Sequence, residues 1–184
     1  MRPQVEKNTT YSVPEVSEDV LKKVPEWAQK AIWYQIFPER FRNGDLNNDP
    51  RMVDMEGAWP HTKFAGWKST TWGQDWFVQE DWALASGKDF YFTVQARRYG
   101  GDFQGIIDKM GYLKDLGINA IYLNPVNDSP SLHKYDARSY HHMDRNFGSD
   151  PDGDAAIMKR EKPEDPSTWE WTSADKLFLK LIET

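Results

Sequence analysis

The sequence contains no cysteine among its 184 residues, which excludes disulfide bonds and thiolate metal sites but leaves the redox compartment open. It also has no run of about 18 apolar residues, the length needed to span a membrane. Its first residues, MRPQVEKNTT, lack the apolar core of a signal peptide. We therefore expect a chain without a membrane partner, in the cytoplasm or, if a signal has been removed, in the periplasm or outside the cell.

Positive charge is scarce as well. The chain has 23 Lys and Arg against 29 Asp and Glu, for a net charge of -6. Because phosphate binding requires clustered Lys and Arg, we expect no nucleic-acid partner. Tryptophan, in contrast, is abundant, with nine residues. This excess is typical of core packing and also of stacking on sugar rings or bases, and composition leaves both interpretations open.

The stretch from Gly100 to Tyr140 carries the strongest fold signal. Asp102 can cap a helix, and Gly117 can end it in the left-handed conformation. Between them, apolar residues recur at helical spacing: Ile106, Ile107, Met110, Leu113 and Leu116. The next run, Ile118–Leu123, predicts a strand buried on both faces. A helix that feeds such a strand is half of a βαβ unit.

Other elements follow from local patterns. Ala31–Phe37 predicts a first strand, also buried on both faces, and Asp89–Ala96 predicts a strand inside a long, Trp-rich excursion over residues 51–99. A short covering helix is expected from Ser17 to Val24, with one more turn around Trp27. Thr172 or Ser173 is expected to cap a final helix. The domain division is therefore a leader with a short helix over residues 1–30 and an α/β domain over residues 31–184.

The loop after the first predicted strand is rich in oxygen-bearing side chains, from Asn43, Asp45, Asn48 and Asp49. Hard cations such as calcium take six to eight oxygen ligands. An EF-hand is disfavoured because its required glycine position holds Asn48 and its closing glutamate position holds Asp54. A solvated turn remains the alternative. Asp150, Asp152 and Asp154 form a second acidic turn, for which a solvated turn is the default and a second cation site the alternative.

Three ordered segments resemble the α-amylase superfamily of retaining glycoside hydrolases, and most closely its neopullulanase and cyclomaltodextrinase-type members. They are YQIFPERFRNGDLNND, RRYGGDFQGIIDKMGYLKDLGINAIYLNP and SLHKYDARSYHHMDRNFG. The resemblance implies a (β/α)8 TIM barrel, which takes about 250 residues. Only the first two strand–helix units are visible, so we expect an incomplete barrel corresponding to the amino-terminal quarter.

The resemblance also implies a mechanism, in which a carboxylate nucleophile and a carboxylic general acid form and break a covalent glycosyl-enzyme intermediate. The segments that carry these groups in the family are not among the three matches. We therefore assign no catalytic residue in this chain. We expect the catalytic carboxyl groups beyond Thr184, and we expect the chain alone to be inactive. The full-length protein is expected to hydrolyse or transfer α-1,4-linked glucans.

Two binding sites are implied by the resemblance. His133 would hydrogen-bond the sugar next to the cleaved bond, and Tyr135 would stack beneath that sugar, with an α-glucan oligosaccharide as the partner. A structural calcium ion would be held by six residues, Asn43, Asp45, Asn48, Asp49, Gly100 and Asp102. In this set Gly100 contributes its backbone carbonyl, and Asp102 would serve both the cation and the helix cap.

A non-catalytic carbohydrate-binding or assembly protein derived from an amylase barrel is the alternative to an enzyme. A third possibility is a stable fragment whose exposed barrel edges are covered by self-association, because unpaired edges invite pairing.

Overall fold

The computed structural model describes residues 24–184 of the chain. The chain divides into two compact units, residues 1–31 and 32–184, and each is described by itself. In the first unit, α2 (Glu26–Gln29) supplies the single turn expected around Trp27. Residues 1–23, which include most of the leader and of the helix predicted at Ser17–Val24, lie outside the described residues. Within residues 24–184, no helix is long and apolar enough to cross a membrane.

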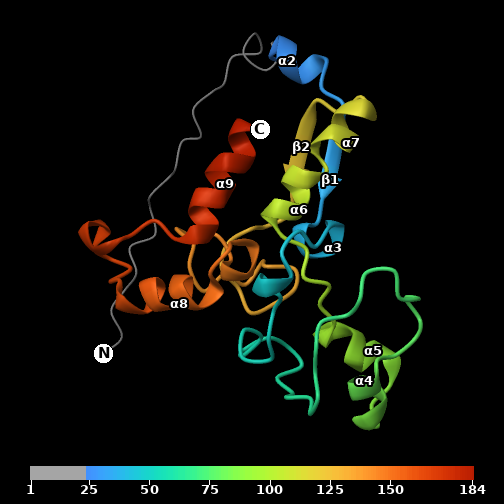
Figure 1. The fold of residues 1–184 in the computed structure, drawn as a ribbon. Helices are drawn as coiled ribbons and strands as arrows, with labels where there is room; N and C mark the ends of the chain where they lie inside the picture. Colours follow the sequence, from blue (N-terminus) through green and yellow to red (C-terminus); the bar gives the residue numbers. More distant parts are fainter. Residues whose placement is uncertain (1–23) are drawn as a thin grey trace, which may run out of the picture. The chain divides into compact units, whose positions relative to one another are not determined.

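The second unit contains two strands and a series of short helices in its described residues (Figure 1). The strands are β1 (Trp33–Ile36) and β2 (Ala120–Leu123). The α-helices are α3 (Pro38–Phe41), α4 (Asp81–Ala85), α5 (Phe90–Thr93), α6 (Phe103–Asp108), α7 (Met110–Asp115), α8 (Pro151–Arg160) and α9 (Ser173–Glu183). The 3-10 helices are η1 (Leu46–Asn48), η2 (Val94–Ala96), η3 (Arg145–Phe147) and η4 (Pro166–Thr168).

The two strands pair in parallel, with Trp33 opposite Ala120 and Ile36 opposite Leu123. The predicted βαβ arrangement is therefore confirmed, although both strands are shorter than predicted. The prediction that they are buried on both faces is wrong. Only one face packs against the helices, and on the other face Trp33 and Tyr122 remain more than half exposed. Each strand has one hydrogen-bonded neighbour among the described residues, and self-association through the free edges stays a prediction.

The helix between the strands begins and ends where the sequence predicts, but it is interrupted. The Asp102 side chain caps it by accepting a hydrogen bond from Gly105 N at 2.6 Å, and Gly117 follows its end with a φ of +84°. Lys109, at φ -99° and ψ 4°, leaves the helical region and divides the predicted single helix into α6 and α7.

A hydrophobic core lies between these helices, the strands and α9. Its buried residues come from β1, α6, α7, η3 and α9, and they are Ile36, Phe103, Ile106, Leu113, Phe147 and Leu181. Thr172 caps α9 through a reciprocal capping box with Asp175, which confirms the predicted start of the last helix. The core thus fixes the ends of β1 and β2 relative to α9.

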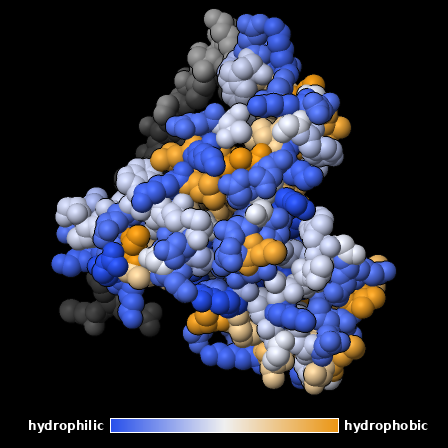
Figure 2. Space-filling model, viewed as in Figure 1, coloured by the Kyte–Doolittle hydropathy of each residue, from blue (hydrophilic) through white to orange (hydrophobic). Residues whose placement is uncertain are grey.

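The Trp-rich excursion has a small core of its own, made by Phe64, Trp82, Ala83 and Ala96. The strand predicted at Asp89–Ala96 is wrong, because this segment forms α5 and η2. Asp89 is the reason at the local level: its side chain accepts a hydrogen bond from Phe92 N at 2.9 Å, which caps a helical turn. Apolar residues also remain on the surface of the excursion, including Phe77 at 76% exposure, and Figure 2 shows hydrophobic residues among hydrophilic ones there.

Candidate functional site

The loops that follow β1 and β2 meet at the carboxyl edge of the sheet, where parallel α/β folds place their functional groups. Asp102, at the start of α6, joins the first loop to the helix. Its carboxylate accepts hydrogen bonds from Asp45 N at 2.9 Å, from Gly44 N at 3.2 Å and from Asn48 Nδ2 at 3.1 Å. The carboxylate is inaccessible to solvent, and burial raises its pKa even though these donors oppose the shift.

The residues predicted to hold calcium form two contacting groups, one in which Asp45 and Asn48 bond to Asp102 and one in which Asn43 and Gly100 lie beside Asp49. Asn43 Nδ2 donates to Asp49 Oδ1 at 2.5 Å. Gly100 adopts a φ of +70°, and a Cβ atom on it would lie only 2.2 Å from Asp49 Oδ1. Glycine is therefore required here both for the left-handed backbone and for the close approach of Asp49.

Two buried oxygens of this cluster fit a cation. The side-chain oxygens Oδ1 of Asn43 and Asn48 are buried and accept no hydrogen bond from the protein. Such unpaired acceptors are costly unless a donor or a cation meets them. The set of amide, carboxylate and carbonyl oxygens suits a hard cation.

Other groups in the predicted set already have protein partners. Asp45 Oδ1 accepts a hydrogen bond from Asn47 N at 2.9 Å and caps η1. The carboxylates of Asp45, Asp49 and Asp102 are not among the groups of three in the described chain whose ligand atoms lie within 4.8 Å of one another. Contacts thus connect the predicted residues in two groups, and the two unpaired amide oxygens are the buried side-chain atoms in them that lack a hydrogen-bond partner.

Buried charged residues, Glu39 and Arg98, lie next to the turn at Gly100. Glu39, in α3, accepts hydrogen bonds from Tyr99 N and from Gly100 N, the latter at 3.3 Å. Burial raises the pKa of the Glu39 carboxyl, while Arg40 and Arg98 oppose the shift. Burial also lowers the pKa of Arg98 to about 10. The α3 segment and the turn at Tyr99 and Gly100 are therefore joined by buried polar contacts as well as by the core.

His133 and Tyr135, the predicted sugar-binding pair, lie together on the exposed surface of the loop after β2. Their ring centroids are 5.7 Å apart, and Tyr135 is 66% exposed. Tyr135 N donates to His133 Nδ1 at 3.1 Å. Between them Lys134 has a φ of +58° and points inward, where its Nζ lies 2.7 Å from Asp144 Oδ2. The alternation presents both aromatic rings to solvent.

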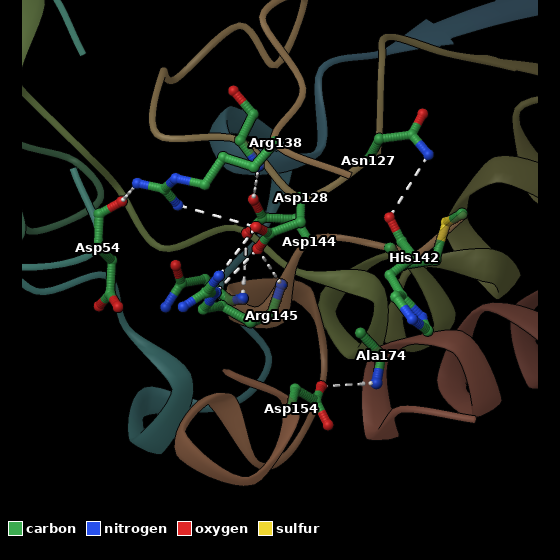
Figure 3. A network of polar contacts seen from close by, with 12 residues as sticks. Asp54, Asn127, Asp128, Arg138, His142, Asp144, Arg145, Asp154 and Ala174 are labelled. Atoms are coloured by element: carbon green, nitrogen blue, oxygen red, sulfur yellow. Dashed lines mark hydrogen bonds and ion pairs between the residues drawn. The ribbon is translucent and has the colours of Figure 1, made fainter. Parts of the chain in front are cut away.

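Asp128 anchors the remainder of this loop (Figure 3). Its carboxylate accepts hydrogen bonds from Arg145 Nε at 2.8 Å and from Arg145 Nη2 at 2.9 Å. Its backbone carbonyl accepts a bond from Arg138 N at 2.7 Å. Arg138 Nη2 in turn donates to the carbonyl of Asp54 at 2.8 Å, so the loop is connected to the excursion.

The second acidic turn has a structural role for each of its carboxylates. Asp150 caps α8 by accepting from Gly153 N at 3.0 Å. Asp152 pairs with Arg51 Nη2 at 2.7 Å. Asp154 is buried and accepts from Ser173 N at 2.7 Å and Ala174 N at 3.0 Å, at the start of α9. The three side chains therefore have different partners, which favours the non-metal interpretation.

Thr184, beyond which the catalytic carboxyl groups are expected, is the C-cap residue of α9. Its Oγ1 donates to the carbonyl of Lys180 at 2.8 Å, and its own carbonyl accepts from Lys114 Nζ at 3.2 Å. The end of α9 is thereby joined to α7. The described residues end at Thr184, and the position of the catalytic groups stays a prediction.

The sequence alone does not assign roles to several polar residues of the site, which are buried except for the partly buried Arg145. The most important are Glu39, Arg98, Asp128, Lys134, Asp144 and Arg145. A charged residue within an otherwise recognisable loop, such as Lys134 between His133 and Tyr135, gives no local sign of burial. Its partner Asp144 lies ten positions away, so the pair becomes visible only when the loop is folded.

A parallel β-α-β unit with polar loops at its carboxyl edge is the arrangement of the first strands of an α/β barrel. The family model described as "Alpha amylase, catalytic domain" matches residues 35–164 of the chain. The chain therefore belongs to the α-amylase catalytic-domain family. Its two strands correspond to part of the barrel, which is incomplete in the described residues.

Individual relatives agree with this assignment. The chain is 40% identical over 138 residues to a cyclomaltodextrinase from Thermoanaerobacter pseudethanolicus, covering 75% of this chain and 18% of the relative. It is 38% identical over 142 residues to an intracellular maltogenic amylase from Bacillus subtilis, covering 77% of this chain and 18% of the relative. Among solved structures, it is similar to the type III pullulan hydrolase from Thermococcus kodakarensis. That match has a TM-score of 0.51 and 29% identity, and covers 67% of this chain and 19% of the other. The chain thus spans less than a fifth of the length of these proteins.

Proposed function

We propose that this chain forms one wall of the substrate cleft of a retaining glycoside hydrolase that acts on α-1,4-linked glucans. The observation that carries this proposal is that His133 and Tyr135 lie side by side on the exposed surface of one loop. The residue between them, Lys134, is buried and paired with Asp144. The names of the relatives, cyclomaltodextrinase and maltogenic amylase, support the same class of substrate.

The geometry of the pair suits a sugar. The flat ring of Tyr135 is available for stacking against the apolar face of a glucose unit. Because His133 Nδ1 accepts the hydrogen bond from Tyr135 N, the neutral imidazole carries its proton on Nε2. That N–H group is then a donor for a sugar hydroxyl. The loop therefore offers a stacking surface and an oriented donor within one short segment.

We assign neither catalytic carboxyl role to this chain. A retaining mechanism needs a nucleophile and a general acid about 5 Å apart across the scissile bond. The buried carboxylates nearest the loop, Asp128 and Asp144, are engaged by Arg145 and Lys134. In the proposal, the reacting groups come from sequence beyond Thr184, and residues 24–184 bind and orient the sugar.

A calcium ion completes the proposal as a structural group. Asn43, Asp45, Asn48, Asp49, Asp102 and the carbonyl of Gly100 would hold it. The two unpaired amide oxygens support this position. When bound, the ion would supply positive charge that neutralises Asp49 and keeps the loop after β1 against the start of α6.

Titration of the chain with maltoheptaose, followed by calorimetry or NMR, tests the sugar site. We expect weak binding that is lost in Tyr135→Ala and retained in Tyr140→Ala, since Tyr140 is 78% exposed and gives a matched aromatic control. The same samples should release no reducing sugar. Equal binding by wild type and Tyr135→Ala would remove Tyr135 from the site, and hydrolysis by the chain alone would show that it contains its own catalytic groups.

The same titration should be repeated on the product of the complete reading frame. Hydrolysis by that longer protein supports an enzyme. Binding without hydrolysis would favour the non-catalytic carbohydrate-binding alternative.

A further inference from the structure

A second cluster of ligating side chains lies apart from both sites described above. Among residues 24–184, His141, His142 and Glu161 form the one group of three His, Cys, Asp or Glu side chains whose ligand atoms lie within 4.8 Å of one another. Glu161 follows α8 as its C-cap residue, and the histidines belong to the loop after β2. The three side chains border a cavity of about 620 Å³.

The atoms that could ligate a metal ion lie close together. Glu161 Oε2 lies 2.6 Å from His142 Nε2 and 3.3 Å from His141 Nε2. In a tetrahedral zinc site, with bonds of about 2.0 to 2.1 Å, donor atoms are roughly 3.3 Å apart. The present spacing needs only a small opening between Glu161 and His142 to reach that geometry.

The outer nitrogens of both rings have partners that orient the inner ones. His142 Nδ1 lies 2.7 Å from Asp175 Oδ2, and His141 Nδ1 lies 3.3 Å from Ser139 Oγ. Asp175 is itself fixed, since its Oδ1 accepts from Met143 N at 2.8 Å. A carboxylate behind a ligating histidine is the arrangement that fixes the ring and its tautomer in metal sites.

Charge supports a dication at this point. With neutral imidazoles, the cluster holds two carboxylates, Glu161 and Asp175. If Asp175 and Ser139 accept the Nδ1 protons, the lone pairs of both Nε2 atoms face Glu161 Oε2, and a cation between them would remove this repulsion. The nearby Arg145 does not supply that charge, because it is paired with Asp128 at 2.8 Å. Protons on the imidazoles or one divalent metal ion can balance the group.

We propose that His141, His142 and Glu161 bind a first-row divalent metal ion of the zinc class, with Asp175 as the residue that positions His142. Two imidazoles and one carboxylate form a ligand set that zinc accepts, and they leave a position open toward the cavity. The ion would connect the loop after β2 to the end of α8 and, through Asp175, to the start of α9. This site is independent of the sugar and calcium sites proposed above.

Zinc titration of the tag-free chain tests the inference by calorimetry, together with the absorption spectrum of the cobalt-substituted protein. We expect one zinc ion per chain, and we expect affinity to fall more than about 100-fold in His141→Ala and Glu161→Gln. Asp175→Asn should weaken binding about 10–100-fold, the effect typical of an outer-shell carboxylate. His133→Ala and Asp45→Ala serve as controls and should bind zinc as the wild type does.

Two results would overturn the proposal. One is no zinc binding by the folded wild-type chain, which would mean that protons alone balance the cluster. The other is binding that survives both His141→Ala and Glu161→Gln. His141 is partly exposed and Glu161→Gln is isosteric, so both variants should fold, and far-UV circular dichroism checks that they do. Maltoheptaose binding should be the same with and without zinc, which separates this test from the test of the sugar site.

Discussion

Lys134 Nζ lies 2.7 Å from Asp144 Oδ2, and both side chains are buried. This ion pair joins the loop that carries His133 and Tyr135 to the segment before η3. Burial raises the pKa of Asp144, and the charge of Lys134 opposes that shift. The pair therefore explains why a lysine stands between two surface aromatic residues: it holds the loop while His133 and Tyr135 face solvent.

Replacing this lysine should destabilise the chain. Lys134→Met keeps the apolar stem but leaves Asp144 buried without its partner, which typically costs about 3–5 kcal/mol. Lys63→Met is the control, because the Lys63–Glu56 pair is exposed and such pairs contribute about 0–1 kcal/mol. Urea denaturation measures both. Similar small losses in the two variants would show that the buried pair does not hold the loop.

The turn at Gly100 offers a second test. Gly100→Ala introduces a left-handed non-glycine residue, which costs about 1–2 kcal/mol, and also a clash with Asp49 Oδ1 at 2.2 Å. Gly87→Ala is a matched control, since Gly87 has a φ of +67° with no heavy atom within 4 Å of the added Cβ. We expect the Gly100 variant to be the less stable of the two in urea. Equal stability would show that the loop yields to the added methyl group.

The elements predicted correctly from sequence are those whose signals are local. The strand within Ile118–Leu123 and the cap at Asp102 each depend on neighbouring residues, and both were confirmed, the strand over Ala120–Leu123. The segment Asp89–Ala96 has the aromatic composition of a strand, but it has no strand to pair with, and the Asp89 cap favours a helical turn instead. Burial on both faces was also wrong, because it requires neighbours beyond β1 and β2.

Much of the candidate site, in contrast, depends on long-range pairs. The positions of His133 and Tyr135 follow from the motif, yet their presentation depends on Lys134 and Asp144. The convergence of His142 with Glu161 and Asp175 joins three elements separated by up to 33 positions. No local pattern specifies such contacts, whereas the folded chain displays them directly.

The loop that carries Tyr135 is also predicted to be sensitive to acid. Burial raises the pKa of Asp136, but hydrogen bonds from Ser131 Oγ and Ser129 Oγ outweigh it and leave the pKa below its usual value. A lowered folded-state pKa means that the stabilisation is present above the unfolded value of about 3.9 and is lost as the pH falls through the folded value.

Ser131→Ala should therefore raise the pKa of Asp136, because it removes the 2.5 Å hydrogen bond to Oδ2. NMR titration of the Asp136 carboxyl carbon measures the change. Ser167→Ala, which removes a hydroxyl bonded to Asp165 instead, is the control and should leave Asp136 unchanged. An ordinary pKa for Asp136 in the wild type would contradict the hydrogen bonding described for this loop.

Calcium should stabilise the chain through the loop after β1. A ligand at 100 times its dissociation constant adds about 2.7 kcal/mol, which for a chain of this size raises Tm by about 5–10 °C. Asp45→Ala should lose that shift.

Asp165→Ala is the matched control, because Asp165 also caps a 3-10 helix, by accepting from Ser167 N at 3.1 Å, but lies outside the predicted set. It should lose some stability yet keep the full calcium response. Thermal melts with calcium and with a chelator distinguish the cases: a wild-type Tm that does not respond to calcium would rule out the site, and a response that persists in Asp45→Ala would remove Asp45 from it.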